Sequence, residues 1–259
     1  MTSNPMLMTE TPSEGVLLLK LNRPDKMNAL ATPLLKDVSQ ALRAGDDDSS
    51  IRVMLITGSD KVFAAGADIV ELNKRSSIDG LNDERVAIWN EIRATRKPLI
   101  AAVEGYCLGA GNELLMCADI AIAAQGAKFG QPETNLGIIP GAGGASLLPR
   151  LVGQQRAMRM VLLGEFLNAD EALECGLVSE VTPAGGALDR ALELSQKIAS
   201  RAPLAMQQGK VIVKNALNTP LNAGLSEERQ AFSLLLSTED KKTGIEAFLG
   251  KTKAKWQGK

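Results

Sequence analysis

Two glutamates, Glu113 and Glu133, have the residue type and the surroundings that proton transfer requires. They lie twenty residues apart, in the glycine-containing and otherwise apolar stretches 105–113 and 129–144. Apolar surroundings raise the pKa of a carboxyl group toward values that suit general acid and base catalysis. Because the chain has no histidine, carboxylates are the leading candidates for proton chemistry, and these two could act as an acid–base pair.

Two glycine-flanked loops, 64–68 and 108–111, each precede a predicted helix. The first N–H groups of a helix have no acceptor within it. Two such groups aimed at one point would form an oxyanion hole. Such a hole suits an acyl thioester, whose carbonyl oxygen becomes enolate-like when a proton moves at the α-carbon. The hypothesis requires the two loops to converge.

Each of these features also has a structural interpretation. A buried glutamate is most often an ion-pair partner, and Gly-Ala-Gly segments are most often tight turns. The glycines at 141–144 could simply let a helix approach a strand. A catalytic interpretation therefore depends on the features acting together.

Nucleotide-binding motifs are incomplete. The segments 109–111 and 141–144 do not continue to G-x-G-x-x-G, because Leu114 and Ser146 occupy the third glycine position. The run that ends at 250–252 resembles a P-loop, but Ile245 stands where that motif needs its first glycine. We therefore expect neither a dinucleotide nor a nucleoside triphosphate.

The three cysteines, Cys107, Cys117 and Cys175, form no C-x-x-C pair. Without histidine they predict no metal site and no disulfide framework, which indicates a cytoplasmic protein. The first ten residues lack the pattern of a secretory signal, and the apolar stretch 99–124 is broken by charged residues, so we expect no membrane span. A net charge of −1 and 3% aromatic residues argue against nucleic-acid binding.

Apolar patterning predicts an α/β core followed by helices alone. We expect Thr32 to cap the first long helix, with Pro33 at its first position. Strands are predicted at 16–21, 51–57, 99–103 and 119–123, and helices at 69–74, 83–96 and 112–117. From residue 188 onward only amphipathic helices are predicted, with breaks near 201–203 and 219–220. The predicted division is a core at 1–197 and a helical region at 198–259.

Several segments together resemble the crotonase family, the enoyl-CoA hydratase/isomerase superfamily. The resemblance runs nearly from end to end and is specific as a combination. The matching segments are 21–24, 28–30, 63–69, 101–105, 109–113, 129–141, 176–178, 238–240 and 246–248.

The resemblance implies a fold, an assembly and a set of roles. The fold would be a spiral of repeated ββα units with a C-terminal helical region that forms homotrimers or hexamers. The N–H groups of Ala67 and Ala110 would hold the thioester carbonyl. Glu113 would activate a water for attack at the β-carbon, and Glu133 would deliver a proton to the α-carbon. Glycine is commoner at position 110 in the family, so the alanine methyl would narrow the acyl pocket.

The resemblance also implies contacts with coenzyme A. Ala65, Asp68 and Ile69 match the loop around the adenine, and Phe248 and Lys251 match C-terminal contacts that are often made across a subunit interface. A solvated tail is an equally good interpretation of Lys251. Coenzyme A would be part of the substrate, and no separate cofactor is expected.

Retention of both glutamates favours a hydratase that adds water reversibly to a trans-2-enoyl-CoA. The alternatives are an enoyl-CoA isomerase and a hydratase for a functionalised acyl chain such as dehydroadipyl-CoA. A non-catalytic CoA-binding or RNA-binding member of the superfamily is the alternative from another functional class.

Overall fold

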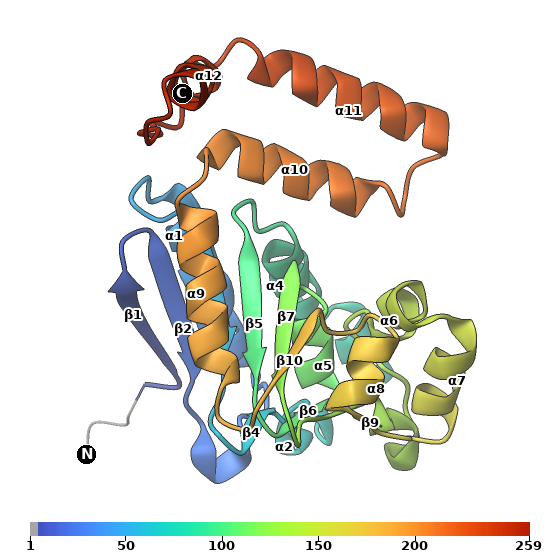
Figure 1. Cartoon of the computed structure of the whole chain (residues 1–259). Coiled ribbons are helices and arrows are strands. Elements are labelled where there is room, and N and C mark those ends of the chain that lie inside the picture. Colours follow the sequence, from blue (N-terminus) through green and yellow to red (C-terminus); the bar gives the residue numbers. More distant parts are fainter. Residues whose placement is uncertain (1–4) are drawn as a thin grey trace.

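The computed structural model describes residues 5–259, which form two sheets, flanking helices and a helical C-terminal arm (Figure 1). The strands are β1 Leu7–Ser13, β2 Val16–Leu21, β3 Val53–Thr57, β4 Val62–Ala64, β5 Leu99–Val103, β6 Tyr106–Leu108, β7 Ile120–Ala124, β8 Lys128–Gly130, β9 Leu167–Asn168 and β10 Glu180–Thr182. The helices are α1 Thr32–Asp47, α2 Ile69–Leu72, α3 Ser77–Leu81, α4 Glu84–Arg93, α5 Ala110–Leu115, α6 Gly144–Val152, α7 Gln154–Leu162, α8 Ala169–Glu174, α9 Ala187–Ala199, α10 Pro203–Asn215, α11 Leu221–Leu235 and α12 Glu239–Leu249, with short 3₁₀ turns η1 Pro24–Lys26 and η2 Pro132–Leu136.

The larger sheet has six strands in the order β1-β2-β3-β5-β7-β10. Only the β1–β2 pair is antiparallel, and the other neighbours run parallel. Helices cover both faces of such a parallel sheet, which explains why β3 and β5 are apolar almost throughout and fully buried.

The smaller sheet has the order β4-β6-β8-β9. From β3 to β8, consecutive strands alternate between the two sheets, and each such pair is followed by helical segments. This is a repeated β-β-α unit, and it confirms the predicted α/β spiral.

The core lies in two layers. The larger apolar cluster fills the space between the two sheets and helices α1, α4 and α5, with Phe63 and Phe129 fully buried. The second cluster lies on the other face of the large sheet, where α9 covers β3, β5 and β7 (Figure 1).

One local expectation was wrong. Thr32 is the first residue of α1, and Ala31 is the N-cap and makes no side-chain bond. The Thr32 N–H and hydroxyl both donate to Glu71 Oε2, at 2.9 Å each, so a contact 39 residues away in sequence takes the place of the cap. Six strands were also not predicted from the sequence, namely β1, β4, β6, β8, β9 and β10.

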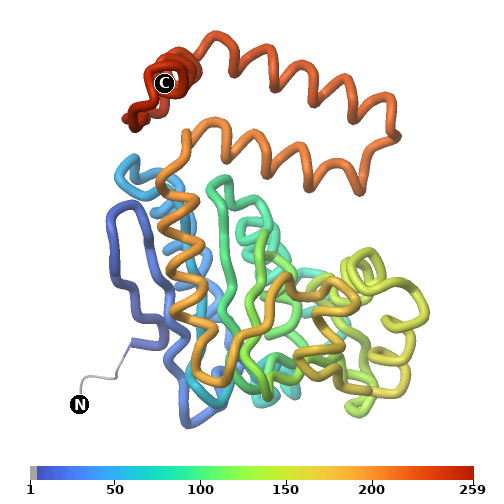
Figure 2. The backbone as a smooth tube through the Cα atoms, viewed as in Figure 1, coloured from blue at the N-terminus to red at the C-terminus, as the bar shows by residue number. Residues whose placement is uncertain are grey.

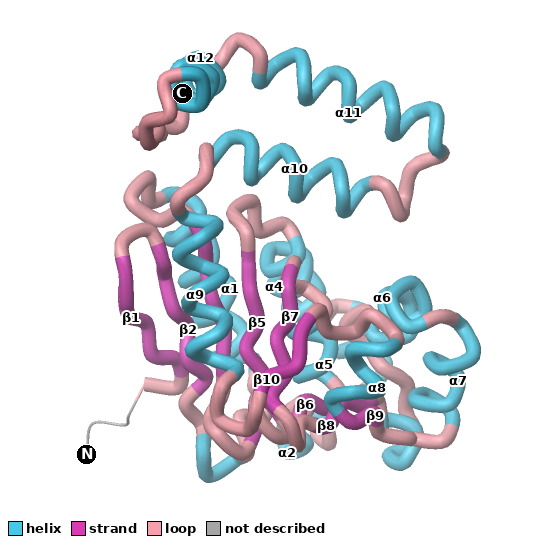
Figure 3. The backbone as a smooth tube through the Cα atoms, in the orientation of Figure 1, coloured by secondary structure: helices cyan, strands magenta, loops and turns pink. Residues whose placement is uncertain are grey.

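Helices α10, α11 and α12 form an arm beyond the end of the large sheet, with α10 and α11 antiparallel (Figure 2). Figure 3 shows this arm as helix and loop only. The division at 197/198 stays a prediction. No helix within residues 5–259 has the length and apolar character needed to cross a membrane.

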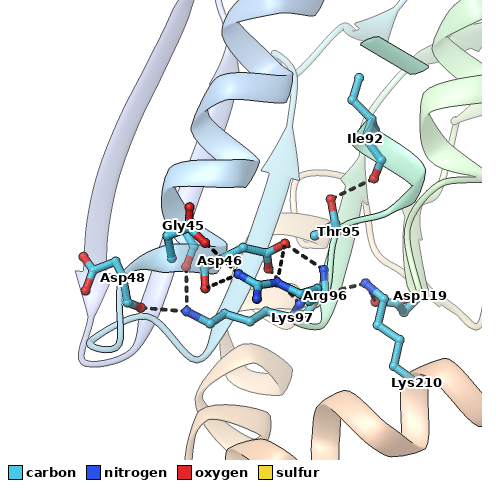
Figure 4. A network of polar contacts seen from close by, with 10 residues as sticks. Gly45, Asp46, Asp48, Ile92, Thr95, Arg96, Lys97, Asp119 and Lys210 are labelled. Atoms are coloured by element: carbon cyan, nitrogen blue, oxygen red, sulfur yellow. Dashed lines mark hydrogen bonds and ion pairs between the residues drawn. The ribbon is translucent and has the colours of Figure 1, made fainter. Parts of the chain in front are cut away.

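Charged side chains attach the arm to the core (Figure 4). Asp119 Oδ2 accepts the Leu99 N–H and the Lys210 ammonium, both at 2.8 Å, and Lys210 Nζ also donates to Lys97 O at 2.7 Å. The Lys97 ammonium in turn donates to the carbonyls of Gly45 and Asp48 at the end of α1. One network therefore joins α1, β5 and α10.

Candidate active site

The two glycine-flanked loops do converge. A methyl group built on Gly109 would lie 3.6 Å from Gly66 Cα, and one on Gly66 would lie 3.7 Å from Leu108 O. Both loops line one pocket of about 270 Å³, which also contains Glu113 and Glu133. The arrangement required by the oxyanion-hole hypothesis is therefore present in a single chain.

Two main-chain N–H groups are available at this junction. Ala110 begins α5 and follows Gly109, whose φ of 51° is one that residues with side chains rarely adopt. Neither Ala110 nor Ala67 donates its N–H to another atom within residues 5–259. Both alanines line the pocket, so their N–H groups could bind a carbonyl oxygen there.

Glu113 is 2% exposed and projects from α5 toward the loop that precedes α6. Its Oε1 accepts the N–H of Ala142 at 2.7 Å and that of Gly144 at 2.8 Å. Gly144 is the first residue of α6, where the unpaired N–H groups favour negative charge. Arg93 Nη1 holds the same loop by donating to Ala142 O at 2.8 Å.

Opposing effects act on the pKa of Glu113. Burial raises its pKa, and the hydrogen bonds from Gly144 and Ala142 partly offset that rise by favouring the carboxylate. Because Oε1 carries both backbone bonds, the second oxygen is left to accept a proton.

Glu133 lies in η2 and is half-buried. Burial raises its pKa to about 7, and the charge of Glu113 adds to this rise. A methyl group on Gly109 would come within 2.9 Å of Glu133 Oε1, so the glycine lets this carboxyl group lie directly beside the start of α5.

The fully buried Gln131 connects the two carboxyl groups. With its amide nitrogen turned toward Glu133, it donates to both carboxyl oxygens at 3.0 and 3.1 Å. The same side chain lies against Gly144, where an added methyl would be 2.7 Å from the end of the Gln131 amide. Gln131 therefore touches both Glu133 and the residue that holds Glu113.

The residues predicted to bind coenzyme A fall into two groups, one at 65–69 and one near the C-terminus. Ala65 and Ile69 line the pocket. Asp68 caps α2 by accepting the N–H groups of Val70 and Glu71, and it pairs with Arg23 at 3.0 Å.

Phe248 and Lys251 lie at the end of the C-terminal arm, and both are exposed. A single chain does not bring them to the pocket. The roles of all five residues stay predictions.

Sequence reasoning missed the contribution of α4 and of the loop 141–144. Arg85, Trp89 and Arg93 of α4 line the pocket, together with Gly141 and Ala142. A signal for the loop was present in the sequence, because glycines before a helix can supply free N–H groups to an anion.

The site combines a buried carboxylate stabilised by two N–H groups, a second carboxyl group of raised pKa, and two free N–H groups. Two titratable groups held in different environments are suited to separate base and acid roles. The arrangement can remove a proton on one side of a bound acyl group, supply one on the other and stabilise an oxyanion between them.

The comparisons with known proteins agree with this chemistry. Residues 11–259 match the family model described as enoyl-CoA hydratase/isomerase. The chain is 47% identical over 246 residues to the 2,3-dehydroadipyl-CoA hydratase of Escherichia coli K12, covering 95% of this chain and 96% of that protein. It is 40% identical over 249 residues to the crotonyl-CoA hydratase of Syntrophomonas wolfei, covering 95% and 96%.

Solved structures share the fold. A crystal structure of enoyl-CoA hydratase subunit I from Geobacillus kaustophilus HTA426 superposes with a TM-score of 0.94 at 36% identity, over 98% of this chain and 99% of that one. The match extends over the whole fold, including the C-terminal arm. The chain therefore belongs to the enoyl-CoA hydratase/isomerase family, the crotonase superfamily.

Proposed function

We propose that this protein is an enoyl-CoA hydratase, a hydro-lyase that adds water reversibly to a trans-2-enoyl-CoA to give a 3-hydroxyacyl-CoA. The observation that carries the proposal is the pair Glu113 and Glu133 in one pocket with two free main-chain N–H groups. Relatives named enoyl-CoA, crotonyl-CoA and dehydroadipyl-CoA hydratase support the reaction class.

In the proposed reaction Glu113 acts as base and Glu133 as acid. The carboxylate of Glu113 takes a proton from water, whose oxygen bonds to the β-carbon. The electron pair of the double bond moves to the thioester oxygen, which the N–H groups of Ala67 and Ala110 stabilise. The enolate then collapses as Glu133 transfers its proton to the α-carbon. Glu113 gains one proton and Glu133 loses one, so the total charge of the two carboxyl groups does not change.

The hydrogen bonds support this division of roles. Glu113 accepts two main-chain N–H groups, which favour its ionised form. Glu133 has a pKa raised to about 7, so a large fraction of it carries a proton near neutral pH. An isomerase needs only one carboxyl group to move a proton between carbons, so the second glutamate favours hydration.

Replacement of each glutamate tests the proposal. Glu113→Gln and Glu133→Gln should each lower crotonyl-CoA hydration by about 10²–10⁴-fold, which is the usual contribution of a general acid or base. Glu165→Gln is a matched control, because Glu165 pairs with Arg159 on the surface, outside this pocket. Near-normal turnover in both active-site variants would show that the assignment is wrong.

We further propose a homotrimer, or a hexamer of two trimers, in the cytoplasm, with coenzyme A as part of the substrate and no separate cofactor. The arm carries large apolar side chains that a single chain leaves exposed, among them Val213 at 72%, Leu234 at 70% and Phe248 at 82%. Exposed apolar surface of this kind marks protein contacts. Native mass spectrometry should find a multiple of three subunits, and a monomer would overturn the proposed assembly.

The chemistry of the acyl chain is a separate question. The relative from Escherichia coli is named for 2,3-dehydroadipyl-CoA, whose acyl chain ends in a carboxylate. A functionalised acyl chain therefore stays open as a second candidate for this protein.

A further inference from the structure

Arg85 is a buried cation in the wall of the active-site pocket. It lies in the first turn of α4, is only 7% exposed and lines the same pocket as Glu113 and Glu133. The proposed acid–base chemistry does not use it. A guanidinium that is shielded from water needs a hydrogen-bonding partner of opposite charge, because buried charges are normally paired and hydrogen-bonded.

Within residues 5–259, Arg85 has almost no such partner. The one hydrogen bond of its guanidinium runs from Nη2 to Leu30 O at 3.4 Å, and no described carboxylate oxygen comes within 4.0 Å of that group. Burial lowers the pKa of this guanidinium, yet arginine keeps its charge in proteins. The cation is therefore buried without a counterion in contact with it.

The other two arginines of the pocket differ in this respect. Arg75 forms an ion pair with Asp83, and Arg93 donates to Ala142 O at 2.8 Å and to Asn90 Oδ1 at 3.0 Å. Their guanidinium groups therefore already have acceptors in the chain. Arg75 and Arg93 each make two side-chain hydrogen bonds within residues 5–259, whereas Arg85 makes one, at 3.4 Å.

The unused donors of Arg85 are accessible. The fully enclosed side-chain nitrogen and oxygen atoms without a partner belong to Ser13, Arg52 and Asn112 within the described chain, and none belongs to Arg85. Since Arg85 is a lining residue of the pocket, its free N–H groups can be reached by a molecule that enters there.

Part of the surrounding wall is apolar, and the charged Arg75 and Asp83 of the same pocket pair with each other. Leu72, Val86, Trp89, Leu136 and Ile139 line the same pocket, and they suit the methylene groups of an acyl chain. A cation within apolar walls selects a ligand that is apolar along its length and anionic at its end. A carboxylate fits a guanidinium especially well, because it can accept two parallel N–H···O bonds.

We propose that Arg85 binds a carboxylate at the far end of the acyl chain, so that the preferred substrates are 2-enoyl-CoA thioesters of dicarboxylic acids. The inference rests on the proposed hydratase function and specifies its substrate class. It makes Arg85 a specificity-determining residue that contacts the substrate away from the reacting carbons.

If Arg85 had a purely structural role, its replacement would have a different effect on activity. The charges of Arg85 and Glu113 attract each other and favour the carboxylate of Glu113. If that attraction were the whole role, loss of Arg85 would lower turnover of every enoyl-CoA by the same factor. A carboxylate-binding role lowers activity selectively.

The test compares two six-carbon substrates, 2,3-dehydroadipyl-CoA and trans-2-hexenoyl-CoA, which differ in the terminal carboxylate. The wild-type protein should have the higher kcat/KM for dehydroadipyl-CoA. In Arg85→Gln the ratio of the two kcat/KM values should fall by about 10–100-fold, as expected when a charge-assisted hydrogen bond is lost, and mainly through KM. Arg85→Lys, which keeps the charge, should recover part of the ratio.

The outcomes separate the two proposals. If the wild type hydrates hexenoyl-CoA as well as dehydroadipyl-CoA, or if the ratio in Arg85→Gln stays within about threefold of the wild-type ratio, the carboxylate role is wrong and the hydratase function stands. If the wild type hydrates neither of these substrates nor crotonyl-CoA, the hydratase function itself is wrong. A melting temperature for each variant shows whether the compared proteins are folded.

Discussion

The Gly144 N–H donates to Glu113 Oε1 at 2.8 Å, so the first residue of α6 fixes a carboxylate that belongs to α5. The position of the proposed base is therefore set by a loop 31 residues further along the chain. Catalytic rates are sensitive to such placement, and a shift of about 1 Å can cost 10²-fold.

Gly144→Ala should lower kcat for crotonyl-CoA hydration by about 10–100-fold, with a smaller change in KM. The added methyl would lie 2.6 Å from Pro140 Cβ and 2.7 Å from the end of the Gln131 amide, so the loop that holds Glu113 must move. Gly141→Ala in the same loop is the matched variant, because no atom lies within 4 Å of its new methyl. Equal kcat values in the two variants would refute the positioning role of Gly144.

Ala110→Pro should lower kcat by about 10²–10³-fold, which is the usual cost of losing one oxyanion-hole donor. Proline removes the N–H group but is tolerated at the first position of a helix, which Ala110 occupies in α5. Ala110→Gly keeps the N–H group and is the control. The measurement is steady-state turnover of crotonyl-CoA together with a melting temperature, and a folded proline variant with normal turnover would exclude this donor.

The pH profile of kcat/KM should fall above about pH 7. Activity requires one proton shared between Glu113 and Glu133, and Glu133, with its pKa raised to about 7, loses that proton as the pH rises through this value. Dehydration of the 3-hydroxyacyl-CoA should show the same upper limb, because the overall reaction neither takes up nor releases a proton. A hydration profile that stays flat to about pH 9 would contradict the role of Glu133.

Lys210→Met should loosen the attachment of α10 to the core. Lys210 is 6% exposed at its side chain and contacts both Asp119 and Lys97 O, and we expect its loss to cost about 1–3 kcal/mol of the free energy of unfolding. Hydrogen exchange at 203–215 should become faster. Lys214→Met is the control: its side chain is 39% exposed, so its ion pair with Asp119 should contribute only about 0–1 kcal/mol. Equal exchange rates in the two variants would rule out a special role for Lys210.

The sequence was sufficient to predict features that depend on local pattern. Apolar runs predicted β2 and β5 with their correct bounds, and the glycine context of Glu113 and Glu133 predicted a shared site. Both kinds of signal come from residues close together in the chain. The resemblance to the family extended them to the spiral fold.

Features that depend on distant contacts could not be predicted in this way. The cap expected at Thr32 failed because Glu71 binds that residue from 39 positions away. The donors to Glu113 lie 29 and 31 positions beyond it. Arg85 has charged neighbours in the sequence, and this pattern predicts a residue on the protein surface. Its burial in the pocket wall depends on the three-dimensional fold.

The attachment of the C-terminal arm has a mechanical consequence for the reaction centre. Asp119 and the carbonyl of Cys117 accept the ammonium groups of Lys210 and Lys214, and both acceptors follow directly on the helix that carries Glu113. A displacement of α10 would therefore reach the residues that follow α5 through these two lysines. If the proposed oligomer forms through the arm, we expect a weakened subunit contact to slow the reaction.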